Sequence, residues 1–175
     1  AMTRTTVASG SWTNAATWSG GNIPGPGEDA VIGAAHTVTV DVSTASMNNL
    51  TNSGTLVFSG WNTVITSTWV TVVGTVTHLP QSATSTNGLG QWVPDARIVI
   101  VCTNLTVDPG GRINATATGF GCSNAASVTG YGPGGGTCSS GGGGGGYGGR
   151  GGNTTGNSGI GGPAYGLVTA PALPG

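Results

Sequence analysis

The chain has 175 residues, a formal net charge of −1 at pH 7 and only 5% charged residues, whereas an average soluble domain has about 25%. Its basic residues are four arginines, and it contains no lysine. Affinity for nucleic acid comes mainly from Lys and Arg on phosphates, so this composition argues against a nucleic-acid partner and against a polybasic membrane patch. No run of about 18 apolar residues occurs, so we expect no membrane insertion.

The start of the chain carries no signal peptide. We therefore expect a mature chain or an excised fragment, with Ala1 and Met2 as a processing or cloning remnant and with a native protein that continues past Gly175. Residues 1–32 are predicted to form an N-terminal cap. Trp12 and Trp18 lie six residues apart in this segment, and we expect them to cover the end of the core, which protects an otherwise open sheet edge.

An internal repeat follows the predicted cap. Segments 49–58, 69–78 and 104–114 align, each with a glycine at a turn, and the first two are 20 residues apart. Alternating strands are predicted before them at 37–42, 62–66 and 97–101, so each unit is expected to run strand, short strand, glycine turn, strand. A period near 20 with short strands is typical of a β-solenoid coil. An insertion at about 78–96, which contains Pro80, Gly88, Gly90 and Pro94, explains the longer third spacing.

Parallel coils place equivalent residues in columns. Two apolar columns and one threonine column are predicted: Leu50, Val70 and Leu105; Leu56, Val76 and Ile113; and Thr51, Thr71 and Thr106 on the outer face. Glycines 54, 74 and 111 are expected at corners, where a φ above zero would require glycine. The predicted fold is all-β, a right-handed parallel β-helix with coils over residues 33–118.

Residues 119–175 form a glycine-rich segment. A flexible linker is one reading of such a composition. Tyr131, Tyr147, Ile160 and Tyr165 are unlike a plain Gly/Ser linker, so we expect an ordered excursion built from packed extended or polyproline-II-like runs, continuing into further coils in the native protein.

The three cysteines form no CxxC pair, which argues against a zinc site. Cys122 and Cys138 flank a glycine-rich loop and are a candidate disulfide. Cys102 lies in an apolar run and is predicted to be a buried thiol.

Several motifs together resemble the N-terminal region of large secreted bacterial parallel β-helix proteins with glycine-rich insertions. They are the Trp-x5-Trp-x-Gly-Gly-x-x-Pro opening, the Asn-Leu-Thr-Val-x3-Gly-Arg-Ile-Asn-Ala motif at 104–115, and the pieces at 147–152 and 162–166. The resemblance implies a secreted or cell-surface location and an adhesin-like or polysaccharide-associated role. By composition, the glycine runs also resemble the tips of phage tail-fibre adhesins.

No catalytic constellation is found in the sequence. Glycoside hydrolysis needs two carboxyl groups across the scissile bond, but Asp41, Asp95 and Asp108 are spread over different predicted coils and turns. His36 and His78 stand at strand ends, where hydrogen-bonded structural roles are expected. We therefore predict no catalytic residue, no metal and no cofactor.

The leading prediction is a non-catalytic structural or adhesive module that contacts a polysaccharide or surface protein. The first alternative is a carbohydrate-binding region, or the N-terminal part of a polysaccharide-degrading enzyme, with Trp61, Trp69 and Trp92 as the aromatic contacts. The second alternative is an extracellular filament subunit that self-associates through open strand edges.

Overall fold

The computed structural model describes residues 1–122, 129–137 and 142–166. Over these residues the regular structure consists of β-strands and three short 3-10 helices, without an α-helix; the 3-10 helices are η1 (Ala15–Thr17), η2 (Ser19–Gly21) and η3 (Thr155–Asn157). The chain divides into two compact units. The first contains residues 1–79 and 96–116, and the second contains residues 80–95 and 117–175.

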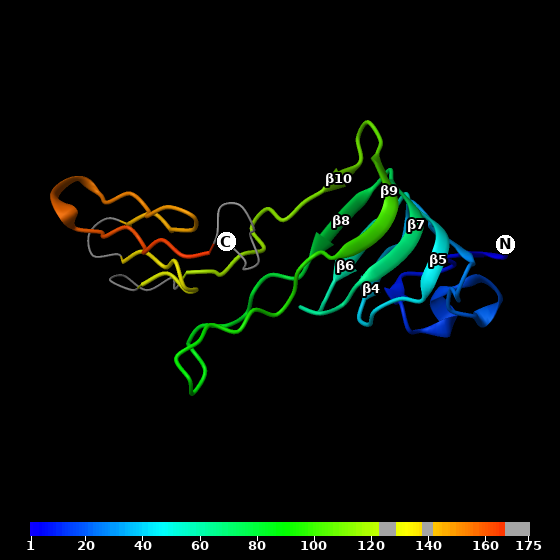
Figure 1. Cartoon of the computed structure of the whole chain (residues 1–175), viewed down its shortest axis with the longest axis horizontal. Coiled ribbons are helices and arrows are strands. Elements are labelled where there is room, and N and C mark those ends of the chain that lie inside the picture. The colour runs from blue at the N-terminus through cyan, green and yellow to red at the C-terminus, as the bar shows by residue number, and fades with distance from the viewer. Residues whose placement is uncertain (123–128, 138–141, 167–175) are drawn as a thin grey trace. The chain divides into compact units, whose positions relative to one another are not determined.

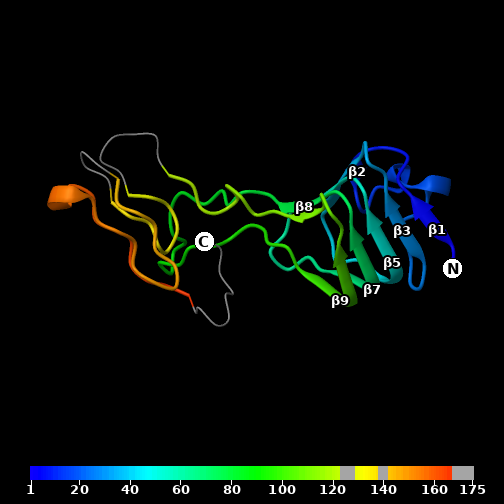
Figure 2. The same cartoon turned by 90° about the horizontal axis from the view of Figure 1, so that it is seen from above.

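The first unit contains two parallel five-stranded sheets. The first sheet has the strand order β1 (Thr3–Thr5), β3 (Asp29–Ile32), β5 (Ser46–Asn52), β7 (Ile65–Val72) and β9 (Ile100–Val107). The second has the order β10 (Arg112–Ile113), β8 (Thr75–His78), β6 (Thr55–Phe58), β4 (Thr37–Val40) and β2 (Gly10–Ser11). The chain thus alternates between the sheets. We define a step as one strand of the first sheet together with the strand of the second sheet that follows it in the chain, for example β5 with β6. Figure 2 shows the first-sheet strands side by side in chain order.

The strand register confirms the predicted columns. In the first sheet, Leu50 pairs with Val70 and Val70 with Leu105, while the threonines at 51, 71 and 106 stack beside them. In the second sheet, Val76 lies between Leu56 and Ile113. Parallel pairing of equivalent strands is what puts like residues above one another.

Two details of the predicted unit are wrong. Each step has two strands rather than three: segment 62–66 enters β7 only at Ile65, and that strand continues to Val72. The strand predicted at 37–42 ends at Val40 and belongs to the second sheet, where it pairs with β6. The structure also contains β1, β2 and β3, which lie within the segment predicted as a cap, so the stack begins earlier than the repeat alignment indicates.

Both sheets contribute to one apolar core. The buried cluster includes Ile32 and Leu50 from the first sheet and Val38, Leu56 and Phe58 from the second. These residues alternate with outward-facing ones along each strand, as a sheet with one buried face requires.

Trp12 and Trp18 belong to this core, and each is only 1% exposed. Their rings meet edge to face at 4.8 Å between centroids, and the Trp18 indole Nε1 donates a 2.9 Å hydrogen bond to the Trp12 carbonyl. Their rings are therefore not available for stacking on a ligand.

Three turn glycines allow the steps to approach closely. A Cβ at Gly74 would overlap the Gly54 carbonyl oxygen and lie 2.6 Å from that of Ser53. A Cβ at Gly54 or at Gly111 would also overlap a backbone carbonyl of the preceding step. None of the three glycines has a positive φ, so the expected left-handed backbone is wrong. Glycine is needed at these corners for its small size.

The last step of the first unit lacks the covering layer that earlier steps have. Leu105 is 47% exposed, while its partner in the previous step, Val70, is 2% exposed. Val107 and Ile113 are also about half exposed, although their partners Val72 and Val76 are buried.

In the second unit, extended glycine runs are joined by backbone hydrogen bonds. At one level three runs form a closed triangle: Gly144 donates to the carbonyl of Gly152, Gly151 to that of Gly162, and Gly162 to that of Gly144, at 2.9–3.0 Å. A fourth run, 134–137, accepts hydrogen bonds from Gly143 and Gly146. The glycine-rich segment is thus ordered over the described residues, as expected, and we call these runs the glycine bundle: 134–137, 142–146, 151–152 and 160–163 (yellow to orange in Figure 1).

The glycine bundle has no room for side chains between its runs. A Cβ at Gly134, Gly143, Gly146, Gly151, Gly161 or Gly162 would overlap a carbonyl oxygen of a neighbouring run. Collagen follows the same rule, in which only glycine fits where extended chains meet.

We predict that Gly74→Ala destabilises the first unit by about 1–3 kcal/mol or more, the usual cost of forcing extra atoms into a filled site. The measurement is the free energy of unfolding from a denaturant titration. The matched control is Gly25→Ala, since a Cβ there meets its nearest atom at an ordinary 3.5 Å, and its effect should stay within about 0.5 kcal/mol. Equal stability of the two variants would contradict the close-approach account.

Candidate functional site

Trp69 lies on the outer face of the first unit. It sits on β7 between Asn49 of β5 and Asn104 of β9, and its side chain is 52% exposed. A flat ring between two amide-bearing residues offers an apolar surface with polar neighbours, a combination suited to a sugar ring.

Trp61 is held by Arg97. The Arg97 guanidinium carbon lies 4.5 Å from the centre of the Trp61 ring, and its Nε donates a 2.7 Å hydrogen bond to the Trp61 carbonyl. This cation–π contact covers the ring. It joins the turn after β6 to the segment before β9.

Trp92 belongs to the second unit, where it forms an aromatic cluster with Phe120 and Tyr131. Its ring centroid lies 5.5 Å from that of Phe120 and 6.4 Å from that of Tyr131. Trp92 and Phe120, together with Pro94 and Pro133, line a cavity of about 540 Å³. The three predicted contact tryptophans are thus divided between the units, two in the first and one in the second.

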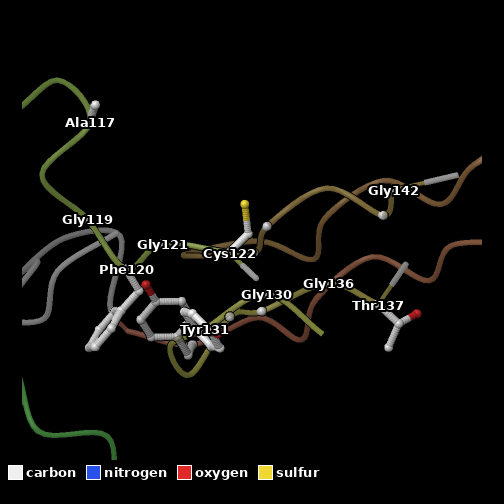
Figure 3. A pocket seen from close by; sticks show the side chains of 16 residues that line it. Ala117, Gly119, Phe120, Gly121, Cys122, Gly130, Tyr131, Gly136, Thr137 and Gly142 are labelled. Carbon is white, nitrogen blue, oxygen red and sulfur yellow. The ribbon is translucent and has the colours of Figure 1, made fainter. Parts of the chain in front are cut away.

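A second cavity, of about 610 Å³, lies within the second unit (Figure 3). We call it the glycine cavity, since most of its lining is glycine backbone; its aromatic lining residues are Phe120, Tyr131 and Tyr165. Figure 3 labels Phe120 and Tyr131 among the residues that line this cavity. The sequence analysis used Tyr131 and Tyr165 only as an indication that the glycine-rich segment is ordered. It did not predict Phe120 as a contact residue. The signal that could have identified them is their position as large rings among glycines.

The second unit also contains an edge-to-face pair, Tyr147 and Tyr165, whose ring centroids are 5.0 Å apart. Burial, with a smaller contribution from Tyr147, raises the pKa of the Tyr165 phenol above its ordinary value. The phenol therefore stays neutral at physiological pH and retains its proton as a donor.

Four of the five carboxylates hold backbone and neighbouring side chains, whereas the Asp108 side chain has no hydrogen-bond partner among the described residues. Glu28 forms a two-bonded ion pair with Arg4 at 2.9 and 3.1 Å and accepts a hydrogen bond from the Gly25 amide. Asp29 Oδ1 accepts hydrogen bonds from Asn48 and from both the amide and side chain of Asn49.

Two further aspartates act in the same way. Asp41 accepts hydrogen bonds from the amide and the hydroxyl of Thr13. Asp95 accepts one from the Ser82 amide, and its own amide donates to Gln81 Oε1. Each of these carboxylates therefore ties together segments that are distant in sequence.

The histidines also have local partners. His36 Nδ1 is hydrogen bonded to the Thr6 hydroxyl at 2.7 Å, and this hydroxyl also accepts from the Gly33 amide. His78 Nδ1 lies 2.8 Å from the Leu79 carbonyl oxygen. Among the described residues, no three His, Cys, Asp or Glu side chains gather to hold a metal ion.

Cys102 lies on β9 and is half-buried against the core. Cys122 is exposed and lines the glycine cavity. Cys138 lies outside the described residues, so the Cys122–Cys138 disulfide stays a prediction. Within residues 1–122, 129–137 and 142–166, no helix has the length and apolar character needed to cross a membrane.

Comparison with known families finds that residues 17–85 are similar to the G8 domain, a domain found in extracellular proteins. The matched segment begins just before Trp18 and contains β3 to β8. No curated protein and no solved structure matches the chain.

The Arg4–Glu28 pair predicts a pH dependence of stability. The hydrogen bonds from Arg4, and then from the Gly25 amide, lower the pKa of Glu28 in the folded protein below its ordinary value of 4.5. Its contribution is therefore complete above the unfolded-state pKa and is lost as pH falls through the lower, folded-state pKa.

The measurement is the melting temperature of the wild type minus that of Glu28→Gln, followed from pH 7 to pH 2. This difference should be positive at pH 7 and shrink at acidic pH. The control Arg4→Gln removes the main partner and leaves the Gly25 amide, so the same comparison made in that background should change less with pH. A wild-type difference that does not change with pH would contradict the assigned pair.

Proposed function

We propose that this chain is a non-catalytic structural and adhesive module of a secreted or cell-surface protein. The G8 domain at residues 17–85 supports the location, since such domains occur in extracellular proteins. In this proposal the first unit is a rigid support and the second unit is the element that makes contact.

The observation that carries the proposal is the use of the polar side chains. Glu28, Asp29, Asp41 and Asp95 each accept hydrogen bonds that join separate segments of the chain. General acid or base chemistry needs such a group within hydrogen-bond reach of a substrate atom. Carboxylates engaged in this way serve the scaffold.

We further propose that the steps of the first unit are coils of a right-handed parallel β-helix, with the Trp12–Trp18 segment as its cap. Three facts support this geometry: every strand pair in the two sheets is parallel, the chain alternates between the sheets, and Ala30, Leu50 and Val70 pair at 20-residue intervals. Connections between parallel strands are right-handed in nearly all proteins. A stack of this kind is stiff, because each coil is hydrogen bonded along its length to the next.

A carbohydrate-binding role is the alternative that a specific observation favours. Trp92 forms an aromatic cluster with Phe120 and Tyr131, and Trp92 and Phe120 line a cavity in the second unit. Aromatic faces present a large apolar area with a small loss of conformational entropy. In this alternative the polysaccharide is the surface to which the module adheres.

Self-association, as in a filament, would use the exposed edge formed by β9 and β10. Leu105, Val107 and Ile113 are half exposed there, and an unpaired strand edge is a template for another chain. The opposite end contains the buried Trp12 and Trp18, so this proposal applies to one end of the stack.

The proposal predicts adhesion without turnover. The full chain should be retained by at least one immobilised cell-surface polysaccharide or surface protein, and no polysaccharide should release new reducing ends or unsaturated products during prolonged incubation. Affinity electrophoresis and a reducing-end assay measure the two properties. Catalytic turnover, or failure to adhere to any such surface, would contradict the proposal.

For the carbohydrate alternative, we predict that Trp92→Ala lowers polysaccharide affinity at least tenfold while Trp69→Ala changes it less than twofold. The reason is that Trp92 has two aromatic neighbours that build a concave surface, whereas Trp69 stands alone on a flat sheet. Quantitative affinity electrophoresis distinguishes the two variants. The opposite result would assign binding to the outer face of the first sheet.

A further inference from the structure

We propose that the glycine cavity of the second unit is a binding site for an uncharged glycan. This inference rests on the proposed adhesive function and names the site and the class of ligand through which adhesion occurs. The cavity is distinct from the three tryptophans that the sequence indicates, because none of them is among its lining residues.

The lining of the cavity is uncharged. Among the described residues it contains no Asp, Glu, Lys, Arg or His; apart from glycine, the described lining consists of Ala117, Phe120, Cys122, Tyr131, Thr137 and Tyr165. A phosphate, sulfate or uronate would enter without a counter-charge, and burying an unpaired charge is costly. The ligand that fits this lining is therefore neutral.

The size of the cavity suits a short oligosaccharide. Its volume of about 610 Å³ falls within the roughly 300–1,000 Å³ of pockets that take ligands of a few rings. The glycine backbone lets such a ligand approach the main chain closely, because no Cβ stands in the way.

The aromatic rings supply the apolar contact. Phe120, Tyr131 and Tyr165 each contribute a ring to the cavity lining (Figure 3). A pyranose ring has C–H groups on its faces, which pack on an aromatic face, while its hydroxyls point outward from its edge. Rings set among exposed peptide groups match both parts of a sugar.

The backbone supplies polar groups of both kinds. Gly145 lines the cavity, and neither its N–H nor its carbonyl makes a hydrogen bond to the described residues. The Gly136 N–H is likewise without an acceptor there. A hydroxyl both donates and accepts, so the hydroxyls of a sugar satisfy both the N–H and the carbonyl of Gly145. A proline-rich peptide also binds aromatic grooves, but proline has no N–H to donate to the Gly145 carbonyl.

The test is a steric block with a matched control. At Gly145 a Cβ would meet its nearest atom, the Gly134 carbonyl oxygen, at 3.8 Å. The backbone therefore has room for a Cβ at this position, and the larger side chain of valine is introduced there to obstruct the cavity wall. A Cβ at Gly149 would meet no atom within 4 Å, and Gly149 does not line the cavity. Gly149→Val is therefore the control. Tyr131→Ala removes one ring, and Tyr131→Phe keeps the ring without its hydroxyl.

The full chain and these variants are measured against neutral glucans, galactans and mannans, a polyuronate and a proline-rich peptide. We expect one or more neutral glycans to bind, with affinity reduced at least tenfold by Gly145→Val and by Tyr131→Ala, within twofold of wild type for Gly149→Val, and only partly reduced for Tyr131→Phe. Circular dichroism spectra identical to wild type would verify that each variant is folded.

Other outcomes would overturn the inference. If glycan binding survives Gly145→Val but is lost in Trp69→Ala, the site lies on the first sheet and the adhesive proposal stands. Preference for the polyuronate or the peptide would replace the ligand class. If the chain adheres to a protein surface and binds no glycan, the glycine cavity is not the contact. If it adheres to nothing, the adhesive function fails together with this inference.

Discussion

Close approach of one backbone segment to another is the constraint on which both units depend. In the first unit, Gly54, Gly74 and Gly111 each face a carbonyl of the preceding step at a distance that no Cβ would permit. In the second unit the same constraint applies along whole runs, where glycines lie against the carbonyl groups of neighbouring runs. Glycine gives up conformational freedom at every such position, so each contact needs hydrogen bonds or a packed core to offset the loss.

The low charge of the chain is consistent with this construction. Short polar side chains bridge the steps: the Thr6 hydroxyl accepts a hydrogen bond from the Gly33 amide, and the Thr13 hydroxyl and the Asn49 side-chain amide donate to Asp41 and Asp29. The few ionised groups are used in the same way, as the Arg4–Glu28 pair shows between β1 and the turn before β3. Among the large rings, Trp12 and Trp18 fill the core, while Phe120, Tyr131 and Tyr165 line a cavity whose walls are otherwise mostly glycine backbone.

The parallel columns could be predicted from the sequence because they repeat: Leu50, Val70 and Leu105 occupy equivalent positions, and the register follows from that equivalence. Strands β1, β2 and β3 were not predicted, because they lack the aligned glycine corner and lie among turn-forming residues. The conformation of the corner glycines was mispredicted because a requirement for small size and one for positive φ select the same residue. The glycine cavity was not predictable. Its rings come from separate runs, and extended glycine runs carry no hydrophobic periodicity that indicates which of them are neighbours.

The most direct test of this account is amide hydrogen exchange in the glycine bundle, followed residue by residue by NMR. The account predicts protected amides at Gly144, Gly151 and Gly162, the donors of the hydrogen-bonded triangle, with slow exchange that approaches that of β5 and β7, and fast exchange at Gly145, whose N–H has no acceptor in the described structure. Uniform exchange at random-coil rates across these glycines would mean that the segment is a flexible linker, and the cavity, with the binding site proposed in it, would not exist.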